Sequence, residues 1–411
     1  MSAAERFDIV LGGVPRFAAE ARWAARLVDR YARRIPFLGM TDARGRRPAV
    51  ADARGEAPVV LVQADPEAYL LPEAALRLVE AIAIPGRDVV VPVTNEPWSE
   101  EARGAPAFAY HTPTLLEEAV REMASRPAPV RHAAAARSPV FAVRREVLAG
   151  LASSLPLDEV PEEACRRGHR VFIDPGAYLH RYGDMDGQAR ADLVARIPAG
   201  AASALDVGCS RGETARLLRK AGITRVVGIE PDAGDAAQAA RLCDRVLGVA
   251  LEDVREEFPG QFDAVLFGDV LEHLVDPSAA LARVRPWLSP RGVVVASVPN
   301  LGHWSVLGDL LEGRFDYVPY SILSGTHVRF FTRRTLHDLF EASGYQVDSI
   351  ETVTFPPSPE GSRKLALLSS LPNASGDLSA VEFLAVAHPT KSLSSLRPSS
   401  LSSLRPTSLS S

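Results

Sequence analysis

The sequence predicts an α/β protein with two domains and a polar tail. Short apolar runs alternate with segments of helical spacing along most of the chain. The 411 residues, 46% of them hydrophobic, suffice for two cores. After Pro389 an octapeptide repeat, SLSSLRPS, replaces this pattern. We therefore expect α/β domains over residues 1–184 and 185–390 and a disordered tail over residues 391–411, which has too few bulky side chains to offset the ordering entropy.

Charge and cysteine content disfavour several classes of protein. A net charge of -5 does not suit non-specific binding of a phosphate backbone, so we expect no nucleic-acid partner. Cys165, Cys209 and Cys243 are too scattered for a CxxC metal site or a disulfide framework. The N-terminal residues lack the pattern of a signal peptide, and no apolar run has the length of a membrane span. Together these features predict a cytoplasmic protein.

The first half of the chain opens with a strand over residues 7–13 and a helix within residues 18–34. Further strands are expected where short apolar runs recur, over residues 35–40, 58–63 and 87–93. Polar, turn-rich connectors are expected over residues 41–48 and 51–58, and a helix over residues 71–83. Residues 138–151 and 168–183 close this half, and residues 187–200 are expected to form a helix that leads into the second.

The second half begins with a glycine turn between a strand and a helix, LDVGCSRGETARLL (residues 205–218). Gly208 and Gly212 let the backbone approach a ligand at the carboxyl edge of a parallel sheet. Asp206, at the end of the strand, suits the amino group of a methionine-like ligand. Glu230 follows 24 residues later, where an acidic side chain accepts hydrogen bonds from ribose hydroxyls. The turn alone would also fit dinucleotide binding.

This turn and four later segments in the same order resemble class I S-adenosylmethionine-dependent methyltransferases. The segments are LEDVREEF, FDAVLFGDVLEHLVDP, LSPRGVVVASVPN and THVRFFTRRTLHDLFEASGY. Ser210 stands where the fuller pattern of the family has a middle glycine. The resemblance implies a Rossmann-like sheet of seven strands and S-adenosylmethionine as cofactor. It implies cofactor contacts at Asp206, Gly208, Cys209, Gly212, Glu230, Leu251, Glu252 and Asp269.

Methyl transfer to a hydroxyl needs a group that removes a proton, and His273 and His327 are the candidate catalytic residues. The alternative for each is a structural role, in helix packing for His273 and in fixing a loop for His327. With Asp269 and Glu272, the two histidines also resemble the set that holds a divalent ion in small-RNA 2′-O-methyltransferases. We expect no metal here, because Asp269 stands where that set has a glutamate.

An insertion over residues 301–325 is rich in aromatic side chains and is expected to form the acceptor pocket. It carries Trp304, Phe315, Tyr317 and Tyr320. His303 and Tyr320 are candidate substrate contacts, whereas helix packing would explain Trp304 equally well.

The first half resembles a reduced glycosyltransferase of the GT-A type, family 2. The resemblance rests on residues 59–82, 138–151 and 157–183. The family binds the metal of a nucleotide-sugar with a DxD triad, and this chain has Gln63, Ala64 and Asp65 there. Asp158 or Glu159 matches the catalytic acidic position. Because an amide replaces the first carboxylate, we expect a diverged or inactive domain that recognises a glycan, with an α/β scaffold that binds no ligand as the alternative.

The sequence thus predicts an enzyme that transfers a methyl group to an oxygen of a small-molecule or glycan-linked acceptor, with phenolic and quinone-like rings left open. A bifunctional glycosyltransferase-methyltransferase and a non-catalytic module that binds S-adenosylmethionine are the alternatives.

Overall fold

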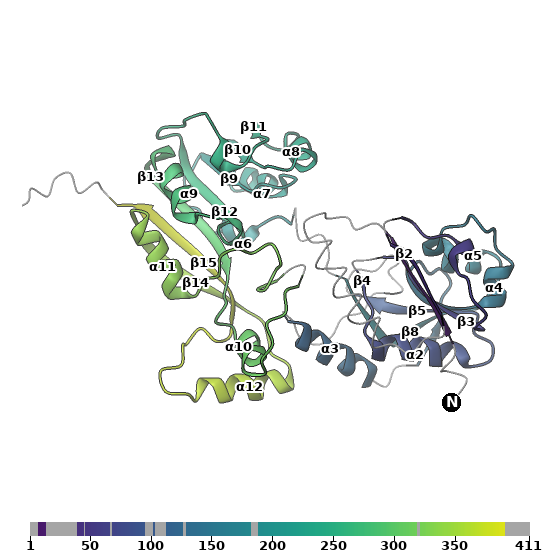
Figure 1. Cartoon of the computed structure of the whole chain (residues 1–411). Coiled ribbons are helices and arrows are strands. Elements are labelled where there is room, and N and C mark those ends of the chain that lie inside the picture. Colours follow the sequence, from purple (N-terminus) through teal and green to yellow (C-terminus); the bar gives the residue numbers. More distant parts are fainter. Residues whose placement is uncertain are drawn as a thin grey trace, which may run out of the picture.

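The computed structural model describes residues 7–13, 39–44, 46–65, 68–94, 102, 112–125, 129–181, 188–318 and 321–390. These residues form two α/β domains, each around its own sheet (Figure 1). The domain boundary predicted at residue 184 and the tail predicted after residue 390 lie outside the described residues. No helix in the described ranges combines the length and the apolar composition that a membrane span requires.

The N-terminal sheet has the strand order β2-β1-β3-β7-β5-β8-β4, and β6 pairs with β8. Its strands are β1 (Phe7–Gly13), β2 (Gly39–Arg44), β3 (Val59–Gln63), β4 (Ala68–Tyr69), β5 (Val89–Thr94), β6 (Arg131–His132), β7 (Val140–Arg144) and β8 (Val171–Arg181). β1 runs parallel to β2 and β3, and β5 runs parallel to β8, whereas β7 is antiparallel to β3 and β5. The parallel strands thus share one carboxyl edge.

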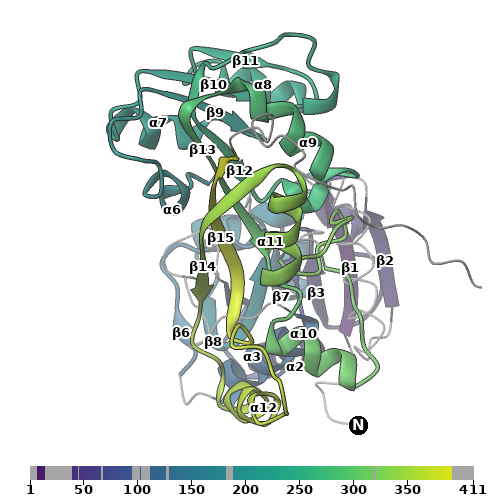
Figure 2. The same ribbon diagram turned by 90° about the vertical axis from the view of Figure 1, so that its left-hand side faces the viewer.

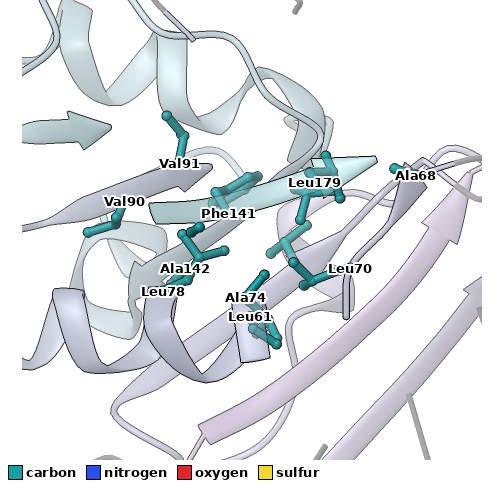
Figure 3. Packing of buried hydrophobic residues seen from close by; sticks show 14 of the residues in the cluster. Leu61, Ala68, Leu70, Ala74, Leu78, Val90, Val91, Phe141, Ala142 and Leu179 are labelled. Carbon is teal, nitrogen blue, oxygen red and sulfur yellow. The ribbon is translucent and has the colours of Figure 1, made fainter. Parts of the chain in front are cut away.

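Short helices cover this sheet. They are η2 (Val50–Asp52), α2 (Pro72–Ala83), α3 (Pro113–Ser125), α4 (Arg145–Ala149), η4 (Leu157–Glu159) and α5 (Val160–Arg166). α2 starts at a proline, which has the backbone angle of a first helical turn, and buries an apolar stripe. Ala74 and Leu78 of this stripe pack beside Leu61 and Ala142 of the sheet (Figure 3).

Most elements predicted for the first half are confirmed, including the strands at β1, β3 and β5 and the helix α2. The prediction that residues 41–48 form a connector is wrong in its first part, because β2 continues to Arg44. β2 lies at the edge of the sheet and exposes Met40, so its pairing with β1 does not require an apolar sequence. The helix predicted within residues 18–34 lies outside the described residues.

The second domain has the seven-stranded sheet that the resemblance implied, in the order β11-β10-β9-β12-β13-β15-β14. The strands are β9 (Ser203–Val207), β10 (Arg225–Ile229), β11 (Arg245–Leu247), β12 (Phe262–Gly268), β13 (Leu288–Pro299), β14 (Tyr345–Thr354) and β15 (Ala380–Pro389). All pairs from β11 to β13 are parallel, and β15 is antiparallel to β13 and β14. The ends of β9, β10 and β12 therefore meet at one carboxyl edge, the usual place for a ligand in such a sheet.

The helices of this domain include α7, which begins at the predicted glycine turn. In chain order they are α6 (Ala191–Val194), α7 (Glu213–Lys220), α8 (Ala233–Ala239), η5 (Leu251–Asp253), η6 (Leu271–His273), α9 (Pro277–Val284), η7 (Arg285–Trp287), α10 (Trp304–Leu311), α11 (Arg333–Ala342) and α12 (Pro359–Ser369). The lead-in helix predicted over residues 187–200 is only the single turn α6, because Pro198 and Gly200 end its pattern.

The insertion after β13 contacts the N-terminal domain. α10 and α12 lie beside α3 in two perpendicular views (Figures 1 and 2). Leu115 of α3 is buried in one apolar cluster with Trp304, Leu368 and Leu378. The two sheets are thus separate, but their domains share packed surface.

Candidate active site

The turn between β9 and α7 contains three residues with left-handed backbone angles. Gly208 has φ +70°, Ser210 has φ +44° and Gly212 has φ +80°. A Cβ atom on Gly208 would lie 2.6 Å from Cγ2 of Val270, and one on Gly212 would lie 2.9 Å from Cα of Ala239. Both glycines are therefore needed for close packing within the protein. The sequence had predicted them for a different reason, the close approach of the backbone to a ligand.

Glu230 follows β10 directly and fastens this turn. Its Oε2 accepts a hydrogen bond from the backbone N–H of Ser210 at 2.9 Å, and its Oε1 accepts one from Asp232 at 2.8 Å. Burial raises the pKa of Glu230, while these two hydrogen bonds oppose that shift. An ionised carboxylate has about four lone-pair positions, so each oxygen can still accept a hydroxyl donor such as those of a ribose.

Asp206 is buried at the end of β9, with 6% of its surface exposed. Burial raises its pKa to about 7, and the charge of Glu230 acts in the same direction, whereas Arg190 lowers it. A buried carboxyl group with this pKa gains most from a cationic ligand beside it. The ammonium group of a methionine-like ligand has that chemistry.

Asp269 follows β12 at the same edge and has φ +55°, an uncommon angle for a residue with a side chain. Ser297 of β13 holds this conformation: its hydroxyl donates to Oδ1 of Asp269 at 2.8 Å and accepts from the Asp269 N–H at 3.0 Å. Nη1 of Arg190 donates to Oδ2 of Asp269 at 2.5 Å. Such a strained, well-held residue at a sheet edge is typical of functional sites.

Arg190 and Glu382 form a charged cluster with Asp269. Neither residue was singled out in the sequence. Arg190 also donates to Asp192 and, through Nη2 at 2.7 Å, to Oε1 of Glu382. Burial and the charge of Asp269 raise the pKa of Glu382 to about 7. An arginine in a lead-in segment and a glutamate in a late strand carry no recognisable motif, so only folding shows that they share this edge.

His273 and His327 come together across 54 residues of sequence, with their ring centroids 4.8 Å apart and their planes nearly perpendicular. Nδ1 of His327 lies 3.0 Å from the carbonyl oxygen of Ile322. A carbonyl only accepts, so Nδ1 donates and the lone pair is on Nε2. Burial, together with the charge of His273, lowers the pKa of His327 to about 4. Burial also lowers the pKa of His273. Both rings are therefore neutral at pH 7, the form that can accept a proton.

Glu272 lies beside the histidine pair and is 1% exposed. Neither of its carboxylate oxygens has a hydrogen-bond partner among the described residues, and burial raises its pKa well above the usual value. One ligand atom each from Glu272, His273 and His327 lie within 4.8 Å of one another, a spacing that could also hold a metal ion. An acceptor hydroxyl or a cation would relieve the cost of this unpaired group.

Comparison with known proteins identifies the family of this chain. A family model described as a methyltransferase domain matches residues 177–350. The ubiquinone biosynthesis O-methyltransferase of Pseudomonas paraeruginosa is 31% identical over 163 residues, which cover 37% of this chain and 68% of that protein. The namesake from Pseudomonas syringae pv. tomato is 32% identical over 163 residues, with the same coverage of 37% and 68%. The chain belongs to the S-adenosylmethionine-dependent methyltransferases.

Solved structures align with about half of this chain. A methyltransferase from Archaeoglobus fulgidus is 19% identical and covers 50% of this chain and 96% of its own length, with a TM-score of 0.37. A Burkholderia thailandensis N1-methyltransferase, solved with 1,6-didemethyltoxoflavin and S-adenosylhomocysteine, is 20% identical and covers 50% of this chain and 80% of its own length, with a TM-score of 0.34.

The other three predicted cofactor contacts of the methyltransferase are Cys209, Leu251 and Glu252. Cys209 is buried in the turn and donates its backbone N–H to the carbonyl of Ile229. Leu251 and Glu252 lie in η5, which follows the neighbouring strand β11, with Leu251 buried in the core and Glu252 exposed. Their contacts with an adenine stay predictions.

The insertion divides into a packed part and an aromatic part. Trp304 is buried against α3, and His303 caps α10 by accepting from Ser305 through Nδ1, so both have structural roles. Phe315 contacts Tyr317 and Phe330 at centroid distances of 5.5 and 6.2 Å. The predicted contact Tyr320 lies outside the described residues.

A row of rings connects this aromatic part to the histidines. Phe330 lies 6.4 Å from His327 by ring centroids, so the row runs from His273 through His327 and Phe330 to Phe315. Phe315 keeps 41% of its surface exposed, which leaves apolar surface available to a ligand near the methyltransferase site.

Proposed function

We propose that the methyltransferase transfers a methyl group to an oxygen of a ring-containing acceptor that binds beside the histidine pair. The observation that carries the proposal is the hydrogen bond from Nδ1 of His327 to the carbonyl oxygen of Ile322, which leaves the lone pair on Nε2, beside His273. Asp269 lies between the histidine pair and the proposed cofactor site. Its charge raises the pKa of both histidines, and it follows β12 at the sheet edge.

When bound, S-adenosylmethionine would supply an electrophilic methyl group. Asp206 is suited to its ammonium group, and Glu230 to its ribose hydroxyls. Nε2 of His327 would accept the proton of the acceptor hydroxyl as the hydroxyl oxygen takes the methyl group. The imidazolium would then release this proton to water.

The aromatic row supports an acceptor with a flat ring or an apolar sugar face. Phe315 offers exposed surface, and Phe330 fixes its distance from His327. The name of the Pseudomonas relatives, ubiquinone biosynthesis O-methyltransferase, agrees with transfer to oxygen. Phenolic and quinone-like rings are therefore the first acceptors to try, followed by glycan-linked ones.

The decisive test is turnover of labelled S-adenosylmethionine with catechols, phenols and sugars, in wild type and in two histidine variants. His327→Gln and His273→Gln are expected to lower turnover by about 10²–10⁴-fold, the usual size of a lost general base, with cofactor affinity unchanged. His337→Gln, at a partly exposed histidine of α11, is the matched control and should retain activity. Full activity of His327→Gln would refute the proposed base.

Metal-free catalysis is part of this proposal. A cation on Glu272, His273 and His327 would compete for the same nitrogen that receives the proton. Turnover is therefore expected to survive dialysis against a chelator. Loss of turnover that returns with Mg²⁺, Mn²⁺ or Zn²⁺, and not with buffer alone, would replace the base by a metal.

Glycan recognition by the N-terminal domain is a separate proposal that rests on its GT-A resemblance. Asp65 follows β3 at the carboxyl edge, and Nε2 of Gln63 donates to the carbonyl of Ala68 at 2.6 Å. Asp158 and Glu159 both accept hydrogen bonds from Arg47. Hydrolysis of a nucleotide-sugar that Asp65→Ala abolishes would support an active glycosyltransferase, whereas glycan binding without hydrolysis would support the diverged domain. A cytoplasmic location stays a prediction.

A further inference from the structure

The insertion of the methyltransferase domain contributes side chains to the core of the other domain. Val306, Val318, Ile322 and Leu323 belong to the N-terminal hydrophobic core, together with strands β1, β3, β5, β7 and β8. All four are at most 1% exposed. Burial of this extent in a second domain means that the insertion cannot shift without opening that core.

The segment that carries these side chains is tightly folded. We call Val318 with residues 321–325 the anchor turn. The N–H of Val318 donates to Leu323 at 2.9 Å, and that of Gly325 donates to Val318 at 2.8 Å. These two hydrogen bonds tie Val318 to Leu323 and Gly325. Ser321 has φ +90°, an uncommon angle for a residue with a side chain.

The anchor turn also holds His327. The backbone N–H of His327 donates to Ser324, and its Nδ1 donates to the carbonyl oxygen of Ile322. The following residues Val328 and Arg329 both donate to the carbonyl of Glu272, which brings His327 beside His273. Ile322 thus places its side chain in the N-terminal core and its carbonyl on the imidazole.

We infer that the N-terminal domain positions the acceptor half of the methyltransferase site, with Ile322 and Leu323 as positioning residues that fix the tautomer and location of His327. This inference rests on the role proposed for His327. It gives the N-terminal domain a role in methyl transfer that needs no glycosyl chemistry. The cofactor half of the proposed site is built on β9, β10 and β12, whose buried residues lie in the hydrophobic clusters of the second domain.

The test compares two buried leucines of the same core in the full-length chain. Leu323→Ala removes an anchor, whereas Leu148→Ala removes an equal volume in α4, on the side of the N-terminal domain away from the methyltransferase domain (Figure 1). Both variants are expected to lower the thermal midpoint. Only Leu323→Ala should lower turnover, by about tenfold or more, because displacement of a catalytic group by an ångström has effects of that size. Affinity for S-adenosylmethionine should stay within about twofold of wild type.

A second measurement does not depend on finding the acceptor. ¹⁵N NMR of histidine-labelled protein reports which ring nitrogen carries the proton, and the His327 signals are assigned from their absence in His327→Gln. Wild type and Leu148→Ala should show His327 protonated at Nδ1, whereas Leu323→Ala should show a mixture of tautomers. Ile322→Val, which removes one methyl group, replaces Leu323→Ala if that variant does not fold. His327 signals that are the same in the anchor and control variants would overturn the inference, even if the proposed function holds.

Discussion

The pKa of Asp206 makes a quantitative prediction about cofactor binding. Burial raises this pKa to about 7. An ammonium group beside Asp206 favours the ionised carboxylate, so a proton must leave when the ligand binds below pH 7. The apparent dissociation constant then increases as the protonated fraction grows. It should rise about tenfold between pH 8 and pH 6, and about another tenfold by pH 5, because each pH unit below a pKa is a factor of ten.

The assay is calorimetric titration of S-adenosylmethionine in buffers of different ionisation enthalpy. At pH 6 the wild type should release about 0.9 proton through Asp206, and at pH 8 about 0.1, from the fraction protonated at each pH. Asp206→Asn is the control, because its amide does not titrate while the ligand and the other carboxyl groups still do. The predicted linkage is the difference between the two proteins. Equal pH dependence in both would refute the assignment of Asp206 to the ammonium group.

The same shift has a consequence for stability. Because the folded empty protein holds this proton more tightly than the unfolded chain, Asp206 stabilises the fold at pH 4 and loses that contribution as the pH rises through 7. Asp206→Asn should therefore gain thermal stability relative to wild type as the pH increases from 5 to 8. A constant difference in midpoint over this range would show that burial does not govern Asp206.

Three further predictions concern the cofactor edge. Glu230→Ala should weaken binding of S-adenosylmethionine by about 1–3 kcal/mol in the same titration, as expected for a lost charged hydrogen-bond partner; unchanged affinity would remove Glu230 from the site. Gly212→Ala should cost about 1–3 kcal/mol more in urea unfolding than Gly222→Ala, because both have positive φ angles but only Gly212 would bring a Cβ atom against backbone; equal losses would contradict the packing argument. Arg190→Met should lower the thermal midpoint more at pH 8 than at pH 6. At pH 8 both Asp269 and Glu382 are charged, and without the arginine they repel each other. A loss that does not depend on pH would mean that the charges are screened.

The placement of Asp206, Gly208 and Glu230 at one sheet edge was predictable from the sequence, because its determinants are local. A glycine turn must follow a strand, and an acidic residue must end the next strand, so spacing alone relates Asp206, Gly208 and Glu230. Parallel pairing of β9, β10 and β12 then brings these residues together without further information. The positive φ angle of Ser210 explains why the family pattern has a glycine there.

The sequence also determined two α/β domains, the seven-stranded sheet and the membership of the methyltransferase family. Only the tertiary structure decided which polar groups meet across long separations in the chain. The side chain of Arg190 binds Glu382, which is 192 residues away in the sequence. His273 meets His327 where the backbone carbonyl of Glu272 accepts hydrogen bonds from the residues after His327. The burial of Ile322 and Leu323 in the other domain could not be predicted either, since an apolar side chain does not specify which core it enters. Local patterns determine elements and turns, whereas contacts between distant segments depend on how complete surfaces pack.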